Sequence, residues 1–503
     1  MKTKWFSAIL ALVLLAGSVS PAAGGALAVA STHKMATFLQ KGPQAIPSNI
    51  TATTPDGVNY GVFTCQVVGL SGANSTCYNP YQMRHAYGID TMINAGLTGK
   101  GYTIVIIDAF QSPRIKAELR AFNAAFGLPS LNGLGLPTKA GLGKFTQVAP
   151  DGLTPFDSTN SQLGQDMQGW AAEISLDVEW AHAIAPGANI VLDLAKSDQD
   201  ADILSATQYA IDNNLGNIIS MSFGENESCV DASIMTAQHN LFVSAAAKNI
   251  TLFASSGDDG ATQFNCDGTA FVKAASSPAS DPLVTAVGGT TLYAARYCKA
   301  LTGCNPAPGT YKRETAWNET ALLGLGASTG GGYSALYPAP YFQQALVPSM
   351  TMRGVPDVAL NAAVGHGVLT YLSIPGMSAS QIGFYLFGGT SASAPEWAGI
   401  LAIADQKAKR SLGYINPTLY QFAQVSTNYT KLYHDILDGT NTDNGIPGFP
   451  AAAGWDPTTG LGSPKANLLI PFLAKYTSQG LTSQAIEGPM PNVNQSGPHQ
   501  VSH

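Results

Sequence analysis

Short apolar runs rich in β-branched residues alternate along this chain with longer segments of helical character, and this alternation constrains the fold more than any other feature. The runs expected to form buried strands are 101–108, 188–194, 217–222, 250–254 and 283–287. The segments expected to form helices are 115–126, 165–183, 201–213 and 391–407. Strands that alternate with helices pair in parallel and are covered on both faces. The sequence therefore predicts an α/β fold with a central, mostly parallel sheet and helices on both faces.

The first thirty residues have the pattern of a secretory signal peptide. Lys2 and Lys4 precede an apolar run from Trp5 to Ala16, and small residues follow. Because this run is shorter than the roughly 20 residues of a spanning helix, a cleaved signal is favoured over an uncleaved membrane anchor. The small residues allow cleavage after Ala23, Ala28 or Ala30. We therefore expect 1–30 to be removed from a secreted, extracellular protein with no stable membrane anchor.

Three regions follow the signal. Residues 31–79 are rich in Thr, Gly, Pro and Asn with weak periodicity, and we expect an irregular extension or a short pro-segment there. Ordered patterns cover 80–475, which we expect to form one domain. Inside it the pair Gly288-Gly289 predicts a turn after the last apolar run. Residues 476–503 are polar and rich in Pro, Gly and Gln, which predicts a disordered tail.

Charge and cysteine content narrow the functional classes. Charged residues make up only 11% of the chain, against roughly 25% in an average soluble protein, and the net charge is −7. With no Lys/Arg run to neutralise phosphates, we expect no nucleic-acid partner. The six cysteines form no Cys-x-x-Cys motif, and an even number in an exported chain predicts disulfides rather than a zinc site. The simplest pairing joins Cys65 to Cys77, Cys298 to Cys304 and Cys229 to Cys266.

The segment GGTSASAP at 388–395 carries a candidate nucleophile. Its two glycines let the backbone approach closely before a predicted helix, and Ser391 then lies at the helix start, where free N–H groups can stabilise an oxyanion. Pro395 fits the first helical turn, where a missing N–H costs little. The alternative is an ordinary helix-capping serine, but in this sequence context we interpret Ser391 as a nucleophile.

A serine nucleophile needs a base. None of the 8 histidines stands in a His-Gly-Thr-His setting, and we interpret His182 and His366 as structural. Glu173 and Asp177 are four residues apart on a predicted helix, which places their Cβ atoms about 5–6 Å apart on one face. If both are buried they share a proton, which raises one pKa and suits a base that works in acid. The alternative is a solvated polar face, to which we assign Glu179.

Two aspartates follow predicted strands. Asp258, in SSGDDG at 255–260, comes after an apolar run, at the strand end where active sites of parallel sheets assemble. The alternative is a simple Asp-Gly turn. Asp259 adds a charge beside it that is expected to raise the pKa of Asp258. Asp108 ends another strand, and without a partner histidine we assign it a structural or pocket-lining role.

Seven motifs that occur in order over 80–475 resemble the sedolisin family of serine-carboxyl peptidases, which have a subtilisin-like three-layer fold. They are the Glu-x-x-x-Asp helix with LDVEWAHAIAPGA, then SMSFGENE, SSGDDG, VTAVGGTT, PDVAL, GGTSASAP and GWDPTTGLG. The resemblance implies an acid-active endopeptidase. It implies that Ser391 is the nucleophile and Glu173 the general base and acid. Asp177 would orient Glu173, and a protonated Asp258 would donate to the oxyanion.

The resemblance also implies one structural Ca²⁺ ion near the C-terminal end of the domain. Its implied ligands are Asp435, Ile436, Ala452, Gly454 and Asp456. Two carboxylates and backbone carbonyls suit a hard cation. Position 452 is alanine where the family usually has glycine, which is compatible with a ligand that acts through its carbonyl. The alternative is an Asp-Pro turn at 456–457.

Other functions stay open beside the endopeptidase. One is a catalytically silent pseudopeptidase that binds peptides, another is an exopeptidase that releases short peptides, and a third is a serine hydrolase with a histidine base. In each peptidase interpretation the partners are polypeptide substrates, and we expect a monomer. Typical family members carry a large N-terminal pro-domain, and 31–79 is far shorter, so activation by removal of such a domain is not expected.

Overall fold

The computed structural model describes residues 51–53, 59–68, 76–323 and 327–475, and the statements below concern these residues. The expected signal peptide at 1–30 and the expected disordered tail at 476–503 lie outside them, as does much of 31–79. Among the helices so described, none combines the length and the apolar character needed to cross a bilayer.

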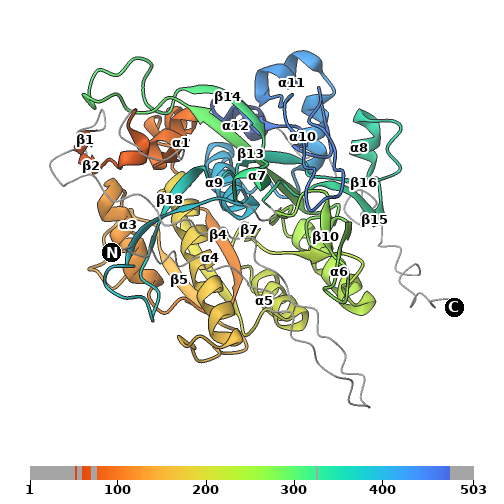
Figure 1. The fold of residues 1–503 in the computed structure, drawn as a ribbon, viewed down its shortest axis with the longest axis horizontal. Helices are drawn as coiled ribbons and strands as arrows, with labels where there is room; N and C mark the ends of the chain where they lie inside the picture. The colour runs from red at the N-terminus through yellow and green to blue at the C-terminus, as the bar shows by residue number, and fades with distance from the viewer. Residues whose placement is uncertain (1–50, 54–58, 69–75, 324–326, 476–503) are drawn as a thin grey trace, which may run out of the picture. The chain divides into compact units, whose positions relative to one another are not determined.

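An eight-stranded sheet forms the centre of the domain, and β4, β5, β7, β13 and β14 are labelled in Figure 1. Its strand order is β14-β13-β9-β7-β4-β6-β5, with β17 paired to β13 off this path. Its strands are β4 (Thr103–Ala109), β5 (Phe145–Val148), β6 (Asn189–Ala195), β7 (Ile218–Met221), β9 (Thr251–Ser255), β13 (Thr285–Ala294), β14 (Tyr311–Ala316) and β17 (Val358–Asn361). Every neighbouring pair is parallel except β13 with β14. The predicted mostly parallel sheet is confirmed, and it carries one antiparallel edge strand.

Helices cover both faces of this sheet, and the four predicted helices are confirmed. On one side α4 (Gln162–Ile184) and α12 (Ala466–Lys475) both pack against α9 (Thr390–Ala408), and α3 (Ile115–Phe126) packs against α4. Elsewhere α5 (Asp200–Asp212) and α6 (Ala232–Ala247) pack on each other and contact β6 and β9. The shorter helices are α1 (Pro80–Ala86), α2 (Ile89–Asn94), α7 (Thr320–Leu323), α8 (Tyr341–Leu346), α10 (Asn416–Ala423) and α11 (Ser426–Leu432).

Small sheets surround the central one. A three-stranded sheet has the order β19-β18-β3, and the remaining strands form two-stranded pairs β1-β2, β8-β12, β10-β11, β15-β16 and β20-β21. Their bounds are β1 (Thr51–Thr53), β2 (Asn59–Gly61), β3 (Thr76–Tyr78), β8 (Glu225–Asn226), β10 (Thr262–Phe264), β11 (Phe271–Lys273), β12 (Ser276–Ser277), β15 (Gly332–Pro338), β16 (Met352–Val355), β18 (His366–Leu372), β19 (Gly383–Phe387), β20 (Tyr433–His434) and β21 (Ser463–Pro464).

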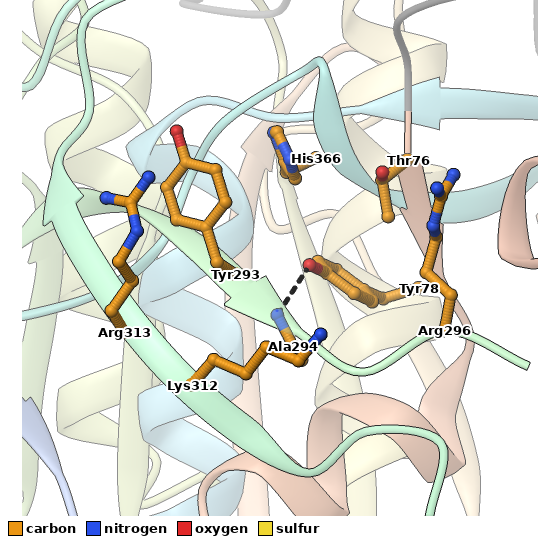
Figure 2. Close-up of a pocket in the computed structure, with 8 residues that line it drawn as sticks. All are labelled: Thr76, Tyr78, Tyr293, Ala294, Arg296, Lys312, Arg313 and His366. Carbon is orange, nitrogen blue, oxygen red and sulfur yellow. Dashed lines mark hydrogen bonds between the residues drawn. The ribbon is translucent and has the colours of Figure 1, made fainter. Parts of the chain in front are cut away.

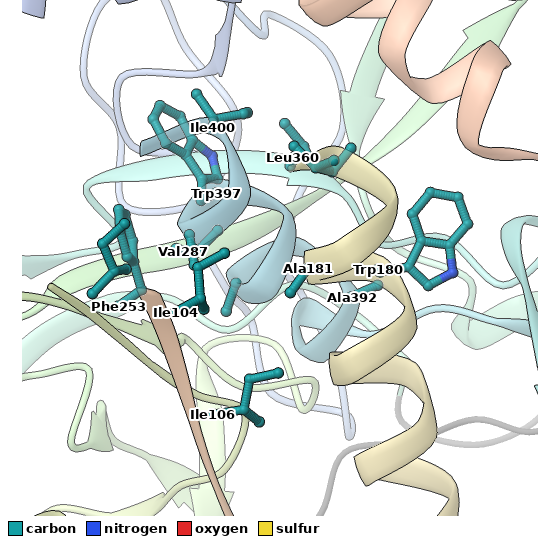
Figure 3. Close-up of a cluster of buried hydrophobic side chains, with 14 of the residues drawn as sticks. Ile104, Ile106, Trp180, Ala181, Phe253, Val287, Leu360, Ala392, Trp397 and Ile400 are labelled. Carbon is teal, nitrogen blue, oxygen red and sulfur yellow. The ribbon is translucent and has the colours of Figure 1, made fainter. Parts of the chain in front are cut away.

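The core lies where α4 and α9 meet the sheet (Figure 3). Every residue of α4 from Trp170 to Ile184 is buried, so this helix is interior rather than amphipathic. A Cβ placed on Gly399 of α9 would lie 2.7 Å from the Cβ of Ile184. Glycine at this position therefore lets the two helices approach closely. This close approach brings the polar residues of α4 to the start of α9.

The turn predicted at Gly288-Gly289 is wrong. Strand β13 runs unbroken through both glycines. A Cβ on Gly288 would lie 2.6 Å from Cγ of Pro356, and a Cβ on Gly289 would lie 2.6 Å from Cβ of Ala362. The glycines therefore permit close packing against a strand and do not change its direction.

Three disulfides join Cys65 to Cys77, Cys229 to Cys266 and Cys298 to Cys304, which confirms the predicted pairing. Within 31–79, expected to be irregular, the described residues include short strands, and β3 pairs in parallel with β18. Tyr60 stacks on Tyr81 with their ring centroids 4.3 Å apart. These described residues thus pack onto the domain that begins at residue 80. The role of 31–79 as a pro-segment stays a prediction.

Candidate active site

Ser391 is the second residue of α9, and the backbone before it is shaped by glycine. Gly389 has a φ of 90°, a conformation that other residues rarely adopt. A Cβ on Gly388 would clash with the carbonyl oxygen of Ala362. The Ser391 side chain is buried, and its Oγ has no hydrogen-bond partner among the described residues. Because the Thr390 and Ala392 N–H groups already have acceptors, the group that the helix start offers beside this hydroxyl is the Ser391 N–H.

Three carboxyl groups gather beside this helix start. Glu173 and Asp177 lie on α4, Asp108 ends β4, and all three are fully buried. Burial raises the pKa of Asp108 well above its usual value, and the nearby Glu173 raises it further. Burial likewise raises the pKa of Asp177, with Asp108 and Glu173 adding to the rise. Because the three carboxyl groups cannot all be ionised together, they share protons. We call these three residues the buried carboxyl cluster.

Ser222 lies between Asp177 and the backbone of Ser391. Its hydroxyl donates to the carbonyl oxygen of Ser391 at 3.3 Å. The same hydroxyl lies beside Asp177 and opposes the rise of that pKa. Asp177 is thus connected to the backbone that carries the candidate nucleophile. Ser222 lies in the motif SMSFGENE, but residue type and spacing alone do not predict its contact with Asp177.

Asp258 follows β9 and is clamped by the residue before the nucleophile. Its Oδ1 accepts hydrogen bonds from the Thr390 backbone N–H at 2.8 Å and from the Thr390 hydroxyl at 2.7 Å. Its Oδ2 has no partner within the described part of the chain. Burial is the main cause that raises the pKa of Asp258, and Asp259 also raises it, as expected. Since both donors occupy Oδ1, the proton belongs on Oδ2, which can then donate to an oxyanion.

Among the described residues, no histidine is bonded to the nucleophile. His182 is buried and its Nε2 lies 2.8 Å from the carbonyl oxygen of Pro129. Burial lowers the pKa of His182 to about 4. His366 lies in a separate cavity between β13, β14 and β18. Neither forms a hydrogen bond with Ser391 Oγ.

The solvated position assigned to Glu179 is wrong. Glu179 is fully buried, and its Oε2 accepts a hydrogen bond from the Tyr371 N–H at 2.9 Å. The error arises because α4 is buried on all sides from Trp170 to Ile184, so a polar residue there does not mark a solvent face. Asp108, to which the sequence assigned a structural or pocket-lining role, lies beside Glu173 and Asp177 and interacts with both. Its involvement depends on strand order, which local sequence does not encode.

The expected metal ligands share one loop region. Asp435 accepts a hydrogen bond from the Gly454 N–H at 3.2 Å, and Asp456 accepts one from the Ala452 N–H at 3.1 Å. Tyr429 donates to both Asp435 Oδ1 and the Gly454 carbonyl oxygen, at 2.8 and 3.1 Å. Burial raises the pKa of Asp456 to about 6. Two carboxylates beside backbone carbonyls are a donor set that fits Ca²⁺.

Buried carboxyl groups also give the fold a preference for acid. Burial raises the pKa of Asp405 to about 8, while its Oδ1 accepts the Leu412 N–H at 2.9 Å. A group whose folded pKa exceeds its unfolded value stabilises the fold fully below the unfolded value, and this stability is lost as pH rises through the folded value. We therefore expect the Tm to fall as pH rises from about 4 to about 8.

The substitution Asp405→Asn keeps the acceptor for Leu412 but cannot ionise. We expect it to reduce the fall in Tm between these pH values. Thermal unfolding followed by circular dichroism measures the effect, with the exposed Asp438→Asn as the control. A fall of the same size in Asp405→Asn and in the unchanged protein would contradict this account.

Known proteins match most of this chain. The profile of the subtilase family matches residues 158–455. Kumamolisin from Bacillus sp. (strain MN-32) is 34% identical over 419 residues, which are 81% of this chain and 65% of that protein. Sedolisin from Pseudomonas sp. (strain 101) is 30% identical over 408 residues, 78% of this chain and 61% of that protein. Tripeptidyl-peptidase 1 from Mus musculus is 27% identical over 358 residues, which are 66% of this chain and 57% of that protein. The chain thus spans somewhat less than two thirds of the length of these relatives.

The fold has a solved counterpart. It is the structure of Pseudomonas sedolisin (serine-carboxyl proteinase) complexed with two molecules of pseudo-iodotyrostatin, with a TM-score of 0.64 and 28% sequence identity. The match covers 79% of this chain and 98% of that one. The predicted subtilisin-like fold is therefore confirmed.

Proposed function

The chain belongs to the sedolisin family of serine-carboxyl peptidases, within the subtilases, and on that premise we propose that it hydrolyses peptide bonds in acid through an acyl-enzyme on Ser391. The observation that carries this proposal is the pairing of Ser391, at the start of α9, with Asp258 clamped by Thr390. Thr390 precedes the nucleophile Ser391 in the chain and also binds the carboxyl group of Asp258, so it links the nucleophile to the expected oxyanion donor.

In the first half of the reaction, Glu173 accepts the proton of the Ser391 hydroxyl while Oγ attacks the peptide carbonyl carbon. The carbonyl oxygen becomes an oxyanion, which accepts hydrogen bonds from protonated Asp258 and from the Ser391 backbone N–H. The tetrahedral intermediate then collapses. The C–N bond breaks, Glu173 returns its proton to the leaving amine, and an acyl ester remains on Ser391.

In the second half, water replaces the amine. Glu173 takes a proton from the water as its oxygen attacks the ester carbonyl, and the same oxyanion contacts form again. Collapse breaks the ester bond, and the proton on Glu173 returns to Ser391 Oγ. Asp177 and Asp108 do not touch the reacting atoms. As positioning residues they interact with Glu173 through their charges and share protons within the buried carboxyl cluster.

Ser391 is buried in this structure. A substrate therefore reaches it only when the residues that cover it move apart. The test of the proposal compares the protein with its Ser391→Ala variant on denatured protein substrate at acidic pH. Proteolysis by the parent alone supports the peptidase. Equal behaviour of the two proteins would favour a pseudopeptidase that binds peptides.

The similarity to tripeptidyl-peptidase 1 makes an exopeptidase the second candidate. The two functions differ in their need for a free substrate N-terminus. An endopeptidase cleaves an internally quenched peptide whether or not its N-terminus is acetylated. An exopeptidase cleaves only the free form and releases short peptides, which mass spectrometry of the products identifies.

We also propose that one Ca²⁺ ion stabilises the region of Asp435 and Asp456. Because a ligand that binds only the folded state raises its stability, chelation with EDTA is expected to lower the Tm by several degrees, and excess Ca²⁺ to restore it. Asp456→Asn is expected to have the low Tm with or without EDTA, while the exposed Asp212→Asn should respond like the parent. A Tm that chelation leaves unchanged in the parent would count against the ion.

We further propose that residues 1–30 direct the export of this peptidase from the cell.

A further inference from the structure

A cavity of about 390 Å³ opens between β13, β14, β18 and β3 (Figure 2). None of the candidate catalytic residues lines it. Its wall includes Tyr78, Tyr293 and His366, and its rim carries Arg296, Lys312 and Arg313. In a chain with a net charge of −7, three cations around one cavity are a marked local excess of positive charge.

A β-bulge directs two of these cations into the cavity. In the pairing of β13 with β14, Tyr293 is opposite Arg313 but Ala294 is opposite Tyr311, so Lys312 is the extra residue. Consecutive side chains of a regular strand point to opposite faces. The bulge breaks this alternation, and both Lys312 and Arg313 line the same cavity. A regular strand would turn one of the two away.

The adjacent cations Lys312 and Arg313 have no acidic partner in the described part of the chain, since no carboxylate there forms an ion pair with either of them. The next residue, Glu314, is buried and accepts hydrogen bonds from the Tyr87 and Thr290 hydroxyls, each at 2.6 Å. Adjacent like charges repel, and a bound anion would relieve that repulsion.

The walls of the cavity are held in place by their own contacts. The Arg313 guanidinium lies 3.7 Å from the centroid of the Tyr293 ring, and the His366 ring lies 4.7 Å from it, centroid to centroid. The Tyr78 hydroxyl donates to the Leu292 carbonyl oxygen at 2.8 Å and accepts from the Ala294 N–H at 3.1 Å. A site fixed in this way loses little entropy when a ligand binds.

We propose that this cavity binds a phosphate or sulfate group, free or carried on a small organic molecule. Guanidinium groups bind such oxyanions through paired hydrogen bonds, and lysine adds a point charge. The volume falls within the range of roughly 300–1,000 Å³ of small-molecule sites, which leaves room for more than the bare ion. The site does not involve Ser391, so the proposal is independent of the peptidase reaction.

Isothermal titration calorimetry of the full chain tests the proposal, with sodium sulfate, sodium phosphate and glucose 6-phosphate as probes at constant ionic strength. We expect saturable binding of one equivalent. In the double variant Lys312→Gln/Arg313→Gln the affinity should fall by about tenfold or more for each cation removed. The control Lys139→Gln/Lys299→Gln changes the net charge equally at two exposed positions outside the cavity, and it should bind like the parent.

The outcomes separate the two ligand sources. Tighter binding of glucose 6-phosphate than of phosphate assigns an organic ester, and equal binding assigns the free ion. Failure of all three probes to bind would overturn the proposal, and so would equal losses in the two double variants. Neither double variant changes a buried residue, so both are expected to fold. Circular dichroism of each variant checks this.

His366 provides a second readout. Burial, together with Arg296 and Arg313, lowers the pKa of His366 to about 4. The groups that face it are these two arginines, Tyr293 on β13 and Tyr78 on β3, with Lys312 on the same rim. Sulfate keeps its charge in acid, so its affinity should rise by up to about tenfold as pH falls through the pKa of His366. His366→Gln should remove that part of the rise. The same pH dependence in both proteins would overturn the role of His366 in the site.

Discussion

Replacing Glu173 by glutamine is expected to lower kcat/KM at acidic pH by about a thousandfold or more, because glutamine preserves the shape of the side chain but cannot take the proton of Ser391. No histidine or other side chain forms a hydrogen bond with Ser391 Oγ among the described residues, and Glu173 belongs to the buried carboxyl cluster beside the start of α9. His182 is bound to the Pro129 carbonyl oxygen instead. The measurement is the hydrolysis of an internally quenched peptide over a range of pH.

The control for this substitution is Glu179→Gln. Glu179 is also fully buried on α4, but it accepts a hydrogen bond from the Tyr371 N–H and forms none with Ser391 Oγ. We expect the folded fraction of this variant to retain most of the activity. If nucleophile and base act as a unit, Glu173→Gln/Ser391→Ala should be no less active than either single variant. A Glu173→Gln enzyme that works best near neutral pH would instead point to a histidine base.

The second large effect concerns Asp258. Replacing it by alanine removes a donor to the oxyanion and is expected to lower kcat by about 10²–10³-fold. Replacing it by asparagine should have a much smaller effect in acid. In Asp258→Asn the side-chain oxygen can still accept the two hydrogen bonds from Thr390, and the amide group can donate where the protonated Oδ2 donated before.

The pH dependence of activity shows whether Asp258 acts through its proton or only through its place in the structure. Burial raises the pKa of Asp258, so the parent holds a proton there in acid and loses it as pH rises. Ionisation removes the donor and places a negative charge beside the oxyanion, so activity should fall on the alkaline side. Asparagine cannot ionise, and the alkaline limit of Asp258→Asn is expected to lie at higher pH than that of the parent. An unchanged limit would show that another group sets it.

Local sequence patterns predicted much of this molecule. The alternation of strands and helices, the helix with Glu173 and Asp177, and the helix that begins near Ser391 follow from composition and spacing within short windows. Two disulfides were predicted correctly because their cysteines are close in the chain, 12 and 6 residues apart, and the third followed because only Cys229 and Cys266 were left. Apart from this third pair the relevant interaction is local, so its physical cause is visible in neighbouring residues.

The failures have one cause in common. Gly288-Gly289 belongs to a strand because Pro356 and Ala362 approach it from distant parts of the chain. Glu179 is buried because other segments surround α4 on all sides. Residue type alone indicates a turn in the first case and a solvent face in the second. The structure decides otherwise because packing against distant segments outweighs a local preference.

The sequence by itself determined which residue types were available for the chemistry: one serine at a helix start, two carboxylates four residues apart, and an aspartate after a strand. Only the tertiary structure decided that Asp108 joins Glu173 and Asp177, that Thr390 clamps Asp258, and that a bulge turns Lys312 and Arg313 into one cavity. The physical reason is that strand order, register and burial are set by contacts between residues far apart in the chain. Those contacts, rather than the residues alone, determine which groups share protons and which charges meet.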